Sequence, residues 1–230
     1  MAGRLLSLLA QGPRLVVSLP HNSPELARAA TDGGADALKV HINVTHEASG
    51  TRFGGLAEER GNLEEILGLG LPTGIVPGTA ASLPSRDDME ELVRMGIDFF
   101  DLYAHDMPTW MTRLEGMTRT VAISDTTPVT AIAHLEKLGF EMLEAAVVPH
   151  EGYGRPLSVA DLMLYRQIRA ATKLPIIVPT QRAIEPEDVT TLIEIGVDAI
   201  MIGAIVTGRE PGSLRAATQR FASSLAARAG

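Results

Sequence analysis

The sequence predicts an α/β protein in which eight parallel strands close into a (β/α)8 barrel, the TIM-barrel architecture. Short runs of β-branched residues alternate along the chain with longer stretches of helical periodicity, and a glycine–apolar–acid motif recurs before every second run. The 230 residues, of which 45% are hydrophobic, are enough for one large core, and a barrel uses such a length as a single domain. We therefore expect one barrel domain over residues 1–230.

The β-branched runs supply the strands of this barrel. The expected strands are residues 15–19, 37–43, 74–76, 99–103, 120–124, 143–148, 175–178 and 199–203. Capping side chains, an early proline or first-turn acids mark helix starts between them at residues 22–25, 62–65, 158–161 and 185–188. Alternation of this kind implies parallel strands joined by helical crossovers.

The recurring motif favours a closed barrel. It reads Gly34-Ala-Asp36, Gly96-Ile-Asp98, Gly139-Phe-Glu141 and Gly196-Val-Asp198, and each copy precedes an even-numbered strand. The glycine ends a helix, and the acid comes just before the strand. Three odd-numbered strands instead follow a proline, at Pro13, Pro72 and Pro175. A unit of two strand–helix pairs, repeated four times, gives the eight strands of a closed barrel. An open doubly wound sheet is the alternative.

Composition excludes several classes of protein. The net charge is -8 and the basic residues are scattered, which is unlike a nucleic-acid-binding surface. The absence of cysteine excludes disulfides and thiolate chemistry, and it is typical of a cytoplasmic protein. Residues 1–10 hold an apolar stretch too short for a signal peptide, which we expect to form a short helix closing the barrel floor. No apolar run approaches the ~20 residues that span a bilayer.

The strand pattern predicts which side chains face the barrel interior. Side chains alternate along a strand, and the more uniformly apolar set should face the helices. On this count Lys39, His41 and Asn43 point inward from the second strand. The fourth strand adds Asp101 and Tyr103. By the same count, the fifth strand contributes Thr120 and Ser124 and the sixth contributes Glu144.

Such an interior is strongly polar, and Lys39 is its central group. Burial of a lone ammonium is costly, so Lys39 needs an acidic partner, an altered pKa or a bound anion, and Asp101 and Glu144 are the available acids. A lysine in this environment has three candidate roles: it transfers a proton, forms a Schiff base with the substrate, or binds an anionic group of the substrate. A purely structural ion-pair network is the alternative. A one-residue shift of the strand register would reverse every assignment.

The loops after the strands carry the active sites of barrel enzymes. Four histidines fall on these loops, namely His21, His46, His105 and His150, and we take His105 and His150 with His41 as candidate acids or bases. Residues 44–55 form a long loop of the kind that covers a substrate. The histidines show no spacing typical of metal ligands, so we predict no metal site, and a divalent metal remains a weaker alternative.

The last two strand–loop units predict a phosphate site. In barrels, backbone amides after strands seven and eight, together with the start of a short helix, hold phosphate groups. Gly203 and Ala204 allow close backbone approach, and Arg182 adds positive charge. We assign phosphate or substrate binding to Arg182, Ala183, Gly203, Ala204, Gly154 and Asn43.

The segment from Gly152 and Tyr153 through Asp161 to Thr207 resembles the ribulose-phosphate-binding barrel superfamily, and within it the N-acetylmannosamine-6-phosphate 2-epimerases. The segment is about a quarter of the chain. Lys39 stands at a position that the family fills with an anion-binding arginine. The resemblance implies a phosphorylated substrate and is less specific for the reaction.

Three departures from the epimerase pattern concern its chemistry. Residues 76–78 stand where the epimerases carry their proton-abstracting lysine, Pro179 and Thr180 where they carry its acidic partner, and Tyr103 replaces an aspartate. If the protein is an epimerase, Lys39 or a histidine of the loops after the strands has taken over the role of the base.

Three functions follow from these patterns. The leading hypothesis is an isomerase, epimerase or lyase (aldolase-like) enzyme that removes a proton next to a carbonyl or imine carbon of a small phosphorylated molecule, needs no cofactor and forms a homo-oligomer. The second is an FMN-binding oxidoreductase, because flavin phosphates use the same kind of phosphate site. The third is a sensor or partner subunit that binds a phosphorylated ligand without chemistry.

Overall fold

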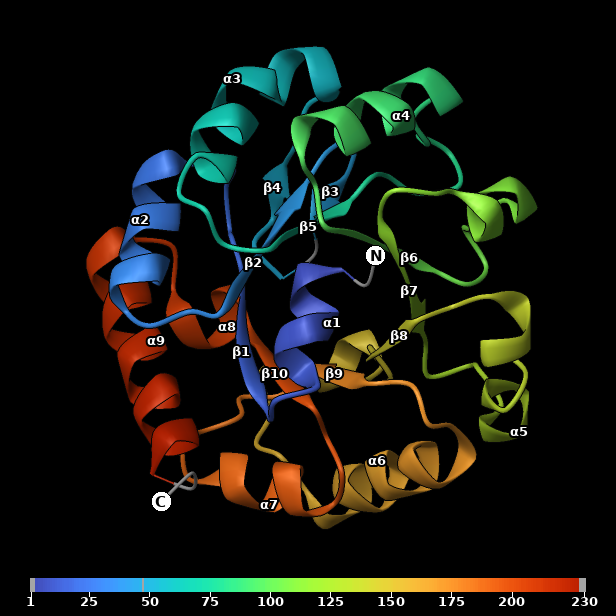
Figure 1. Cartoon of the computed structure of the whole chain (residues 1–230). Coiled ribbons are helices and arrows are strands. Elements are labelled where there is room, and N and C mark those ends of the chain that lie inside the picture. The colour runs from blue at the N-terminus through green and yellow to red at the C-terminus, as the bar shows by residue number, and fades with distance from the viewer. Residues whose placement is uncertain (1–2, 47, 228–230) are drawn as a thin grey trace.

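The computed structural model of the chain describes residues 3–46 and 48–227. Its main strands form one closed parallel barrel in the ring order β1-β10-β9-β8-β7-β6-β5-β2, surrounded by helices (Figure 1). The barrel strands are β1 (Arg14–Ser18), β2 (Ala37–His41), β5 (Thr73–Val76), β6 (Phe99–Tyr103), β7 (Thr118–Ile123), β8 (Met142–Ala145), β9 (Ile176–Pro179) and β10 (Ala199–Ile202). The predicted (β/α)8 barrel is confirmed, and the open sheet is excluded.

Helices follow most of the strands and form the outer layer of Figure 1. The helices are α1 (Arg4–Leu9), α2 (Pro24–Asp32), α3 (Leu56–Leu67), α4 (Arg86–Met95), α5 (Val129–Ile132), α6 (Val159–Ala171), α7 (Asp188–Glu194), α8 (Ala204–Thr207) and α9 (Pro211–Ala226). Three 3-10 helices are η1 (Thr109–Arg113), η2 (Glu136–Leu138) and η3 (His150–Gly152). In the described chain, η1 takes the place of an α-helix between β6 and β7. Within the described ranges, no helix is both long and apolar enough to span a bilayer.

The apolar side chains form two separate cores. The larger core lies between strands and helices and contains outward residues such as Leu38, Phe100 and Ile200. The smaller core fills the lower part of the barrel, where α1 inserts Leu5 and Leu9 against strand residues. In Figure 1, α1 lies across the middle of the ring of strands. The prediction of a short N-terminal helix on the barrel floor is confirmed.

The glycine–apolar–acid repeat has a common structural role. Its four glycines all adopt a positive φ between 91° and 100°, which ends the preceding helix in the left-handed region. Each acid then donates its backbone N–H to an odd-numbered neighbour strand: Asp36 to Leu15 O, Asp98 to Thr73 O, Glu141 to Arg119 O and Asp198 to Ile176 O. The repeat therefore aligns pairs of strands at the barrel floor.

The acidic side chains of the repeat bind backbone amides as well. Asp36, Glu141 and Asp198 accept N–H groups from the odd-numbered strand that precedes each of them in the chain. Asp98 differs, because its carboxylate accepts the amides of Arg4 at 2.7 Å and Leu5 at 2.8 Å. Asp98 thereby fixes the start of α1 to the barrel.

The largest departure from the predicted elements lies after β2. This strand ends at His41 instead of continuing to residue 43, because Asn43 turns the chain with a φ of 56°. The following loop contains a small antiparallel hairpin of β3 (Thr45–His46) and β4 (Thr51–Arg52). Helix α3 begins at Leu56, before the predicted start signal at residues 62–65. The part of this loop at residue 47 lies outside the described residues.

Candidate active site

A cavity of about 360 Å³ opens at the carboxyl ends of the strands, where barrel enzymes carry their active sites. Its lining residues come from the barrel interior, the hairpin after β2 and the loops after the other strands. They are Ser18, Lys39, His41, Val44, Thr45, His46, Ala48, Val76, Gly78, Thr79, Asp101, Leu102, Tyr103, His105, Asp106, Ala122, Glu144, Ala146, Tyr153, Pro179, Thr180, Gln181, Met201 and Gly203. The predicted residues Lys39, His41, Asp101, Glu144 and His105 thus share one cavity.

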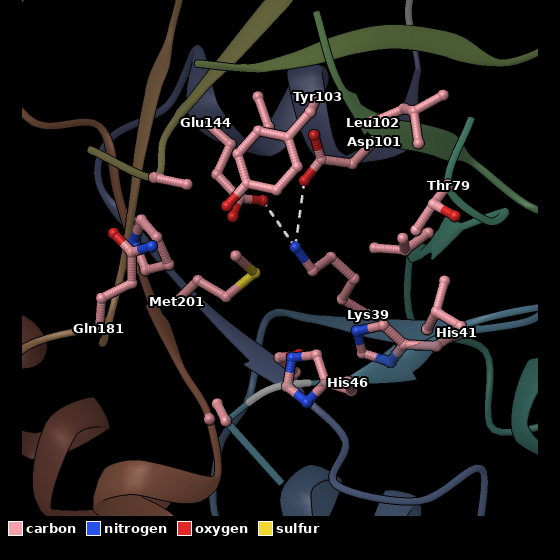
Figure 2. A pocket seen from close by; sticks show the side chains of 18 of the residues that line it. Lys39, His41, His46, Thr79, Asp101, Leu102, Tyr103, Glu144, Gln181 and Met201 are labelled. Atoms are coloured by element: carbon pink, nitrogen blue, oxygen red, sulfur yellow. Dashed lines mark hydrogen bonds and ion pairs between the residues drawn. The ribbon is translucent and has the colours of Figure 1, made fainter. Parts of the chain in front are cut away.

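A buried ion-pair cluster forms the floor of this cavity. The ammonium Nζ of Lys39 donates to Glu144 Oε2 at 2.6 Å and to Asp101 Oδ2 at 3.1 Å, as the dashed lines in Figure 2 mark. All three side chains are less than 10% exposed. The second carboxylate oxygen of Asp101, Oδ1, is buried without a hydrogen-bond partner among the described residues. The cluster predicted from strand parity is therefore confirmed.

Electrostatics fixes the charge of Lys39. Burial alone lowers the pKa of Lys39, but the Glu144 and Asp101 carboxylates outweigh burial and raise this pKa above its ordinary value. The amine is therefore held as an ammonium at neutral pH. A Schiff base requires a neutral amine, so the free protein favours the roles of charge stabiliser or proton donor for Lys39.

The two charged neighbours of Glu144 shift its pKa in opposite directions. Burial, followed by the negative charge of Asp101, raises the pKa of Glu144 well above its usual range, although Lys39 opposes this shift. Fully ionised, the cluster would carry two negative charges and one positive charge, so one bound proton makes it neutral. The 2.6 Å contact marks Glu144 as an acceptor from Lys39, while burial favours its protonation. Glu144 can therefore bind a proton in a pH range where an exposed glutamate is ionised.

The hairpin after β2 covers one side of the cavity through aromatic contacts. The His41 ring lies 4.5 Å from the ring of His46 and 4.8 Å from that of Phe53, measured between centroids. His46 Nδ1 is 3.0 Å from Ser49 Oγ, which fixes the second histidine within the hairpin. In its described part, the loop of residues 44–55 thus forms one wall of the cavity.

Both histidines of this wall are held neutral. Burial, followed by the charges of His46 and Lys39, lowers the pKa of His41 well below its usual value. Burial and then Lys39 lower the pKa of His46 to about 4. Neutral imidazoles can donate and accept hydrogen bonds but do not attract anions as cations would.

Among the residues assigned to phosphate binding, Gly203 lines the cavity. Its amide donates to Thr180 Oγ1 at 2.9 Å. Ala204 begins the short helix α8 directly after Gly203, so its amide has no acceptor within that helix.

The other assigned residues lie outside the cavity lining. The amide of Gly154 donates to Gln181 O, and the amide of Ala183 donates to Arg155 O, so the fold itself uses these groups. The expected inward direction of Asn43 is wrong, because the chain turns there and its amide group donates to Pro77 O.

Arg182 and His150 also lie outside the cavity lining. The Arg182 guanidinium donates twice to Asp161 Oδ1, at 2.9 and 3.1 Å, and once to Gly152 O at 2.9 Å. These contacts connect the loop after β9, which carries Arg182, with the loop after β8 and with the start of α6. The His150 ring packs against Tyr153 with centroids 5.1 Å apart.

Several lining residues were absent from the predicted site. Ser18 ends β1, and its position was predictable because Leu15, Val17 and Leu19 all face the helices. Gln181 accepts from the amide of Val148 at 3.0 Å. It also donates to the Tyr153 hydroxyl at 2.7 Å. No local pattern marks this contact, because it joins two loops. Among the described residues, no group of three or more His, Asp or Glu side chains is placed to hold a metal ion.

Comparisons with known proteins support the fold. No family model and no curated protein sequence matches the chain. Tryptophan synthase from M. tuberculosis matches with a TM-score of 0.74 at 14% identity, over 98% of this chain and 99% of the other. Thiamine phosphate pyrophosphorylase from Pyrococcus furiosus matches with a TM-score of 0.66 at 17% identity, over 97% and 100%. KGPDC from Streptococcus mutans matches with a TM-score of 0.69 at 12% identity, over 95% and 99%.

The TM-scores show a shared barrel fold, and the low sequence identities leave the reaction of this protein open. Each of the three matches covers nearly the whole of both chains. The resemblance to the 2-epimerases gains no specific support from the three structures. The chemistry is therefore inferred from the cavity.

Proposed function

We propose that the protein is an enzyme that transfers a proton next to the carbonyl group of a small phosphorylated substrate. The observation that carries this proposal is the buried contact of Lys39 with Glu144 and Asp101 on the cavity floor. An ammonium and two carboxyl groups, of which Glu144 has a raised pKa, can serve as charge stabiliser, base and acid.

The proposed reaction divides these roles. The ionised carboxyl group of the pair accepts the proton from the carbon next to the substrate carbonyl. The Lys39 ammonium stabilises the negative charge that develops on the carbonyl oxygen, and the protonated carboxyl group donates its proton to that oxygen. Return of a proton to the opposite face of the same carbon gives an epimer, and return to the neighbouring carbon gives an isomer.

The phosphate part of the proposal has separate support. Gly203 lines the cavity, and the amide of Ala204, which has no acceptor within α8, follows it directly at a place where barrels hold phosphate. The name of one structural relative, thiamine phosphate pyrophosphorylase, also points to phosphate chemistry. The resemblance of residues 152–207 to phosphate-binding barrels agrees with this assignment.

Proton exchange in heavy water tests the proposal without knowledge of the product. The purified protein is incubated in heavy water with a panel of aldose and ketose phosphates, and proton NMR follows the signal next to the carbonyl. We expect loss of this signal for at least one compound. Lys39→Met should slow the exchange at least a hundredfold. Exposed Lys137 provides the matched control, Lys137→Met.

Three results would contradict the proposal. Binding of panel compounds without any exchange would favour a ligand sensor. Retained exchange in folded Lys39→Met would remove Lys39 from the mechanism. A yellow protein with a flavin absorption spectrum would instead favour the FMN-dependent oxidoreductase.

A further inference from the structure

His41 is a buried polar side chain that the fold leaves without hydrogen bonds. The residue is 1% exposed, lines the cavity, and neither Nδ1 nor Nε2 has a partner among the described residues. His46 differs, because its Nδ1 lies within hydrogen-bond distance of Ser49 Oγ. His41 therefore holds a donor and an acceptor that the described part of the fold leaves unsatisfied, both of them buried beside the cavity.

The fold itself does not need these nitrogens. The ring packs against the rings of His46 and Phe53, and a phenyl ring at position 41 would make similar contacts. Burial of an imidazole without a hydrogen bond costs stability that a phenyl ring would not lose. A costly group at the edge of a cavity is typical of a functional site.

The position of His41 relative to Lys39 defines what it can reach. The two residues lie on the same face of β2, and His41 is one step nearer to the mouth, about 7 Å along the strand. Figure 2 shows the His41 ring beside the Lys39 side chain. A small molecule bound over the Lys39 ammonium would therefore place a second functional group near His41.

We propose that His41 is a substrate-binding residue whose imidazole hydrogen-bonds a hydroxyl group of the substrate, next to the carbon on which the Lys39 cluster acts. A hydroxyl group both donates and accepts, which matches the two free nitrogens of a neutral imidazole. This inference rests on the proposed function and restricts its substrate to hydroxylated phosphates.

Binding measurements with matched ligands test this role. The ligands are ribose 5-phosphate, 2-deoxyribose 5-phosphate and inorganic phosphate, titrated by calorimetry into the wild type and His41→Phe. We expect His41→Phe to weaken ribose 5-phosphate binding about tenfold, as for one lost hydrogen bond. The loss should be smaller for 2-deoxyribose 5-phosphate, which lacks one hydroxyl group, and inorganic phosphate should bind both proteins equally. The variant should unfold at the same temperature or roughly 2–4 °C higher.

One control variant separates substrate binding from packing, and a second substitution of His41 replaces the first if needed. His46→Phe changes a neighbouring ring that is already bonded to Ser49, and it should weaken ribose 5-phosphate binding less than His41→Phe does. His41→Leu serves if the phenyl ring does not fit.

Three outcomes would decide against the proposals. An equal loss of affinity for inorganic phosphate and ribose 5-phosphate would indicate general damage and overturn the inference. Ribose 5-phosphate binding that His41→Phe leaves unchanged would overturn it as well, with the proposed function intact. If the wild type binds none of the three ligands, inorganic phosphate included, the phosphate part of the proposed function fails and the inference fails with it.

Discussion

Lys39 Nζ lies 2.6 Å from Glu144 Oε2, and this contact crosses the whole barrel. Lys39 is on β2 and Glu144 is on β8, which are opposite each other in the ring of strands. Asp101 on β6 lies midway between them on one side of the ring. Three strands thus direct charged side chains to one point above the apolar floor, where solvent is largely excluded.

The first prediction concerns the charge of Glu144. An acid whose pKa is raised in the folded state binds more protons there than in the unfolded state, so folding stability falls as pH rises above its ordinary pKa. Glu144→Gln cannot ionise. Its free energy of unfolding should therefore rise relative to the wild type as pH increases, by up to about 1.4 kcal/mol per pH unit.

Urea unfolding of both proteins at pH 5, 7 and 9 measures this difference. Glu141→Gln is the control, because Glu141 lies at the barrel floor and is partly exposed. Parallel stability curves for Glu144→Gln and the wild type would show that Glu144 is ionised in the folded protein throughout this range.

The second prediction concerns acid stability. The pKa values of His41 and His46 are lowered in the folded state, the latter to about 4, whereas an unfolded histidine titrates near pH 6.5. The unfolded state then binds more protons below pH 6.5, so stability should fall as pH drops from 6.5 towards 4. Each buried imidazole contributes up to about 1.4 kcal/mol per pH unit.

Substitution of either histidine should make the free energy of unfolding depend less steeply on pH between 6.5 and 4. His41→Phe and His46→Phe are compared with His134→Phe, which changes an exposed histidine. Free energies of unfolding at pH 6.5, 5.5 and 4.5 provide the measurement. An equal slope in wild type and both cavity variants would mean that neither imidazole is kept neutral by the fold.

The barrel was predictable because its determinants are local. Each strand is a short apolar run, and the recurring glycine adopts a positive φ that few other residues tolerate. The charged cluster was predictable for a similar reason, because side chains alternate strictly along a strand. Lys39, Asp101 and Glu144 follow from that alternation once the apolar face of each strand is known.

The loops were predicted less well because their contacts are not local. The hairpin of β3 and β4 and the ring contacts of Phe53 depend on packing across the mouth. Arg182 was expected to bind phosphate, but it pairs with Asp161, a residue 21 positions away, and no pattern near Arg182 indicates this partner. The hydrogen bonds of Asp98 to the amides of Arg4 and Leu5 likewise depend on where α1 packs against the barrel.

The third prediction concerns the attachment of α1. Asp98 accepts two amides at the start of this helix, so Asp98→Ala should lower the free energy of unfolding by about 2 kcal/mol. Asp36→Ala is the matched variant, because Asp36 accepts the single amide of Leu15 and should cost about half as much. Hydrogen exchange should also show faster exchange of the α1 amides in Asp98→Ala alone. Equal losses without that change would contradict the assigned attachment.

The fourth prediction separates structure from ligand binding at Arg182. Its guanidinium bonds Asp161 and Gly152 O outside the cavity lining, so Arg182→Met should destabilise the protein by about 2 kcal/mol. Phosphate affinity in the folded variant should stay within twofold of the wild type. Arg166→Met, on the exposed side of α6, is the control for loss of a surface charge. A tenfold or greater loss of phosphate affinity in Arg182→Met alone would restore the role that the sequence predicts, and would mean that Arg182 leaves Asp161 when a ligand binds.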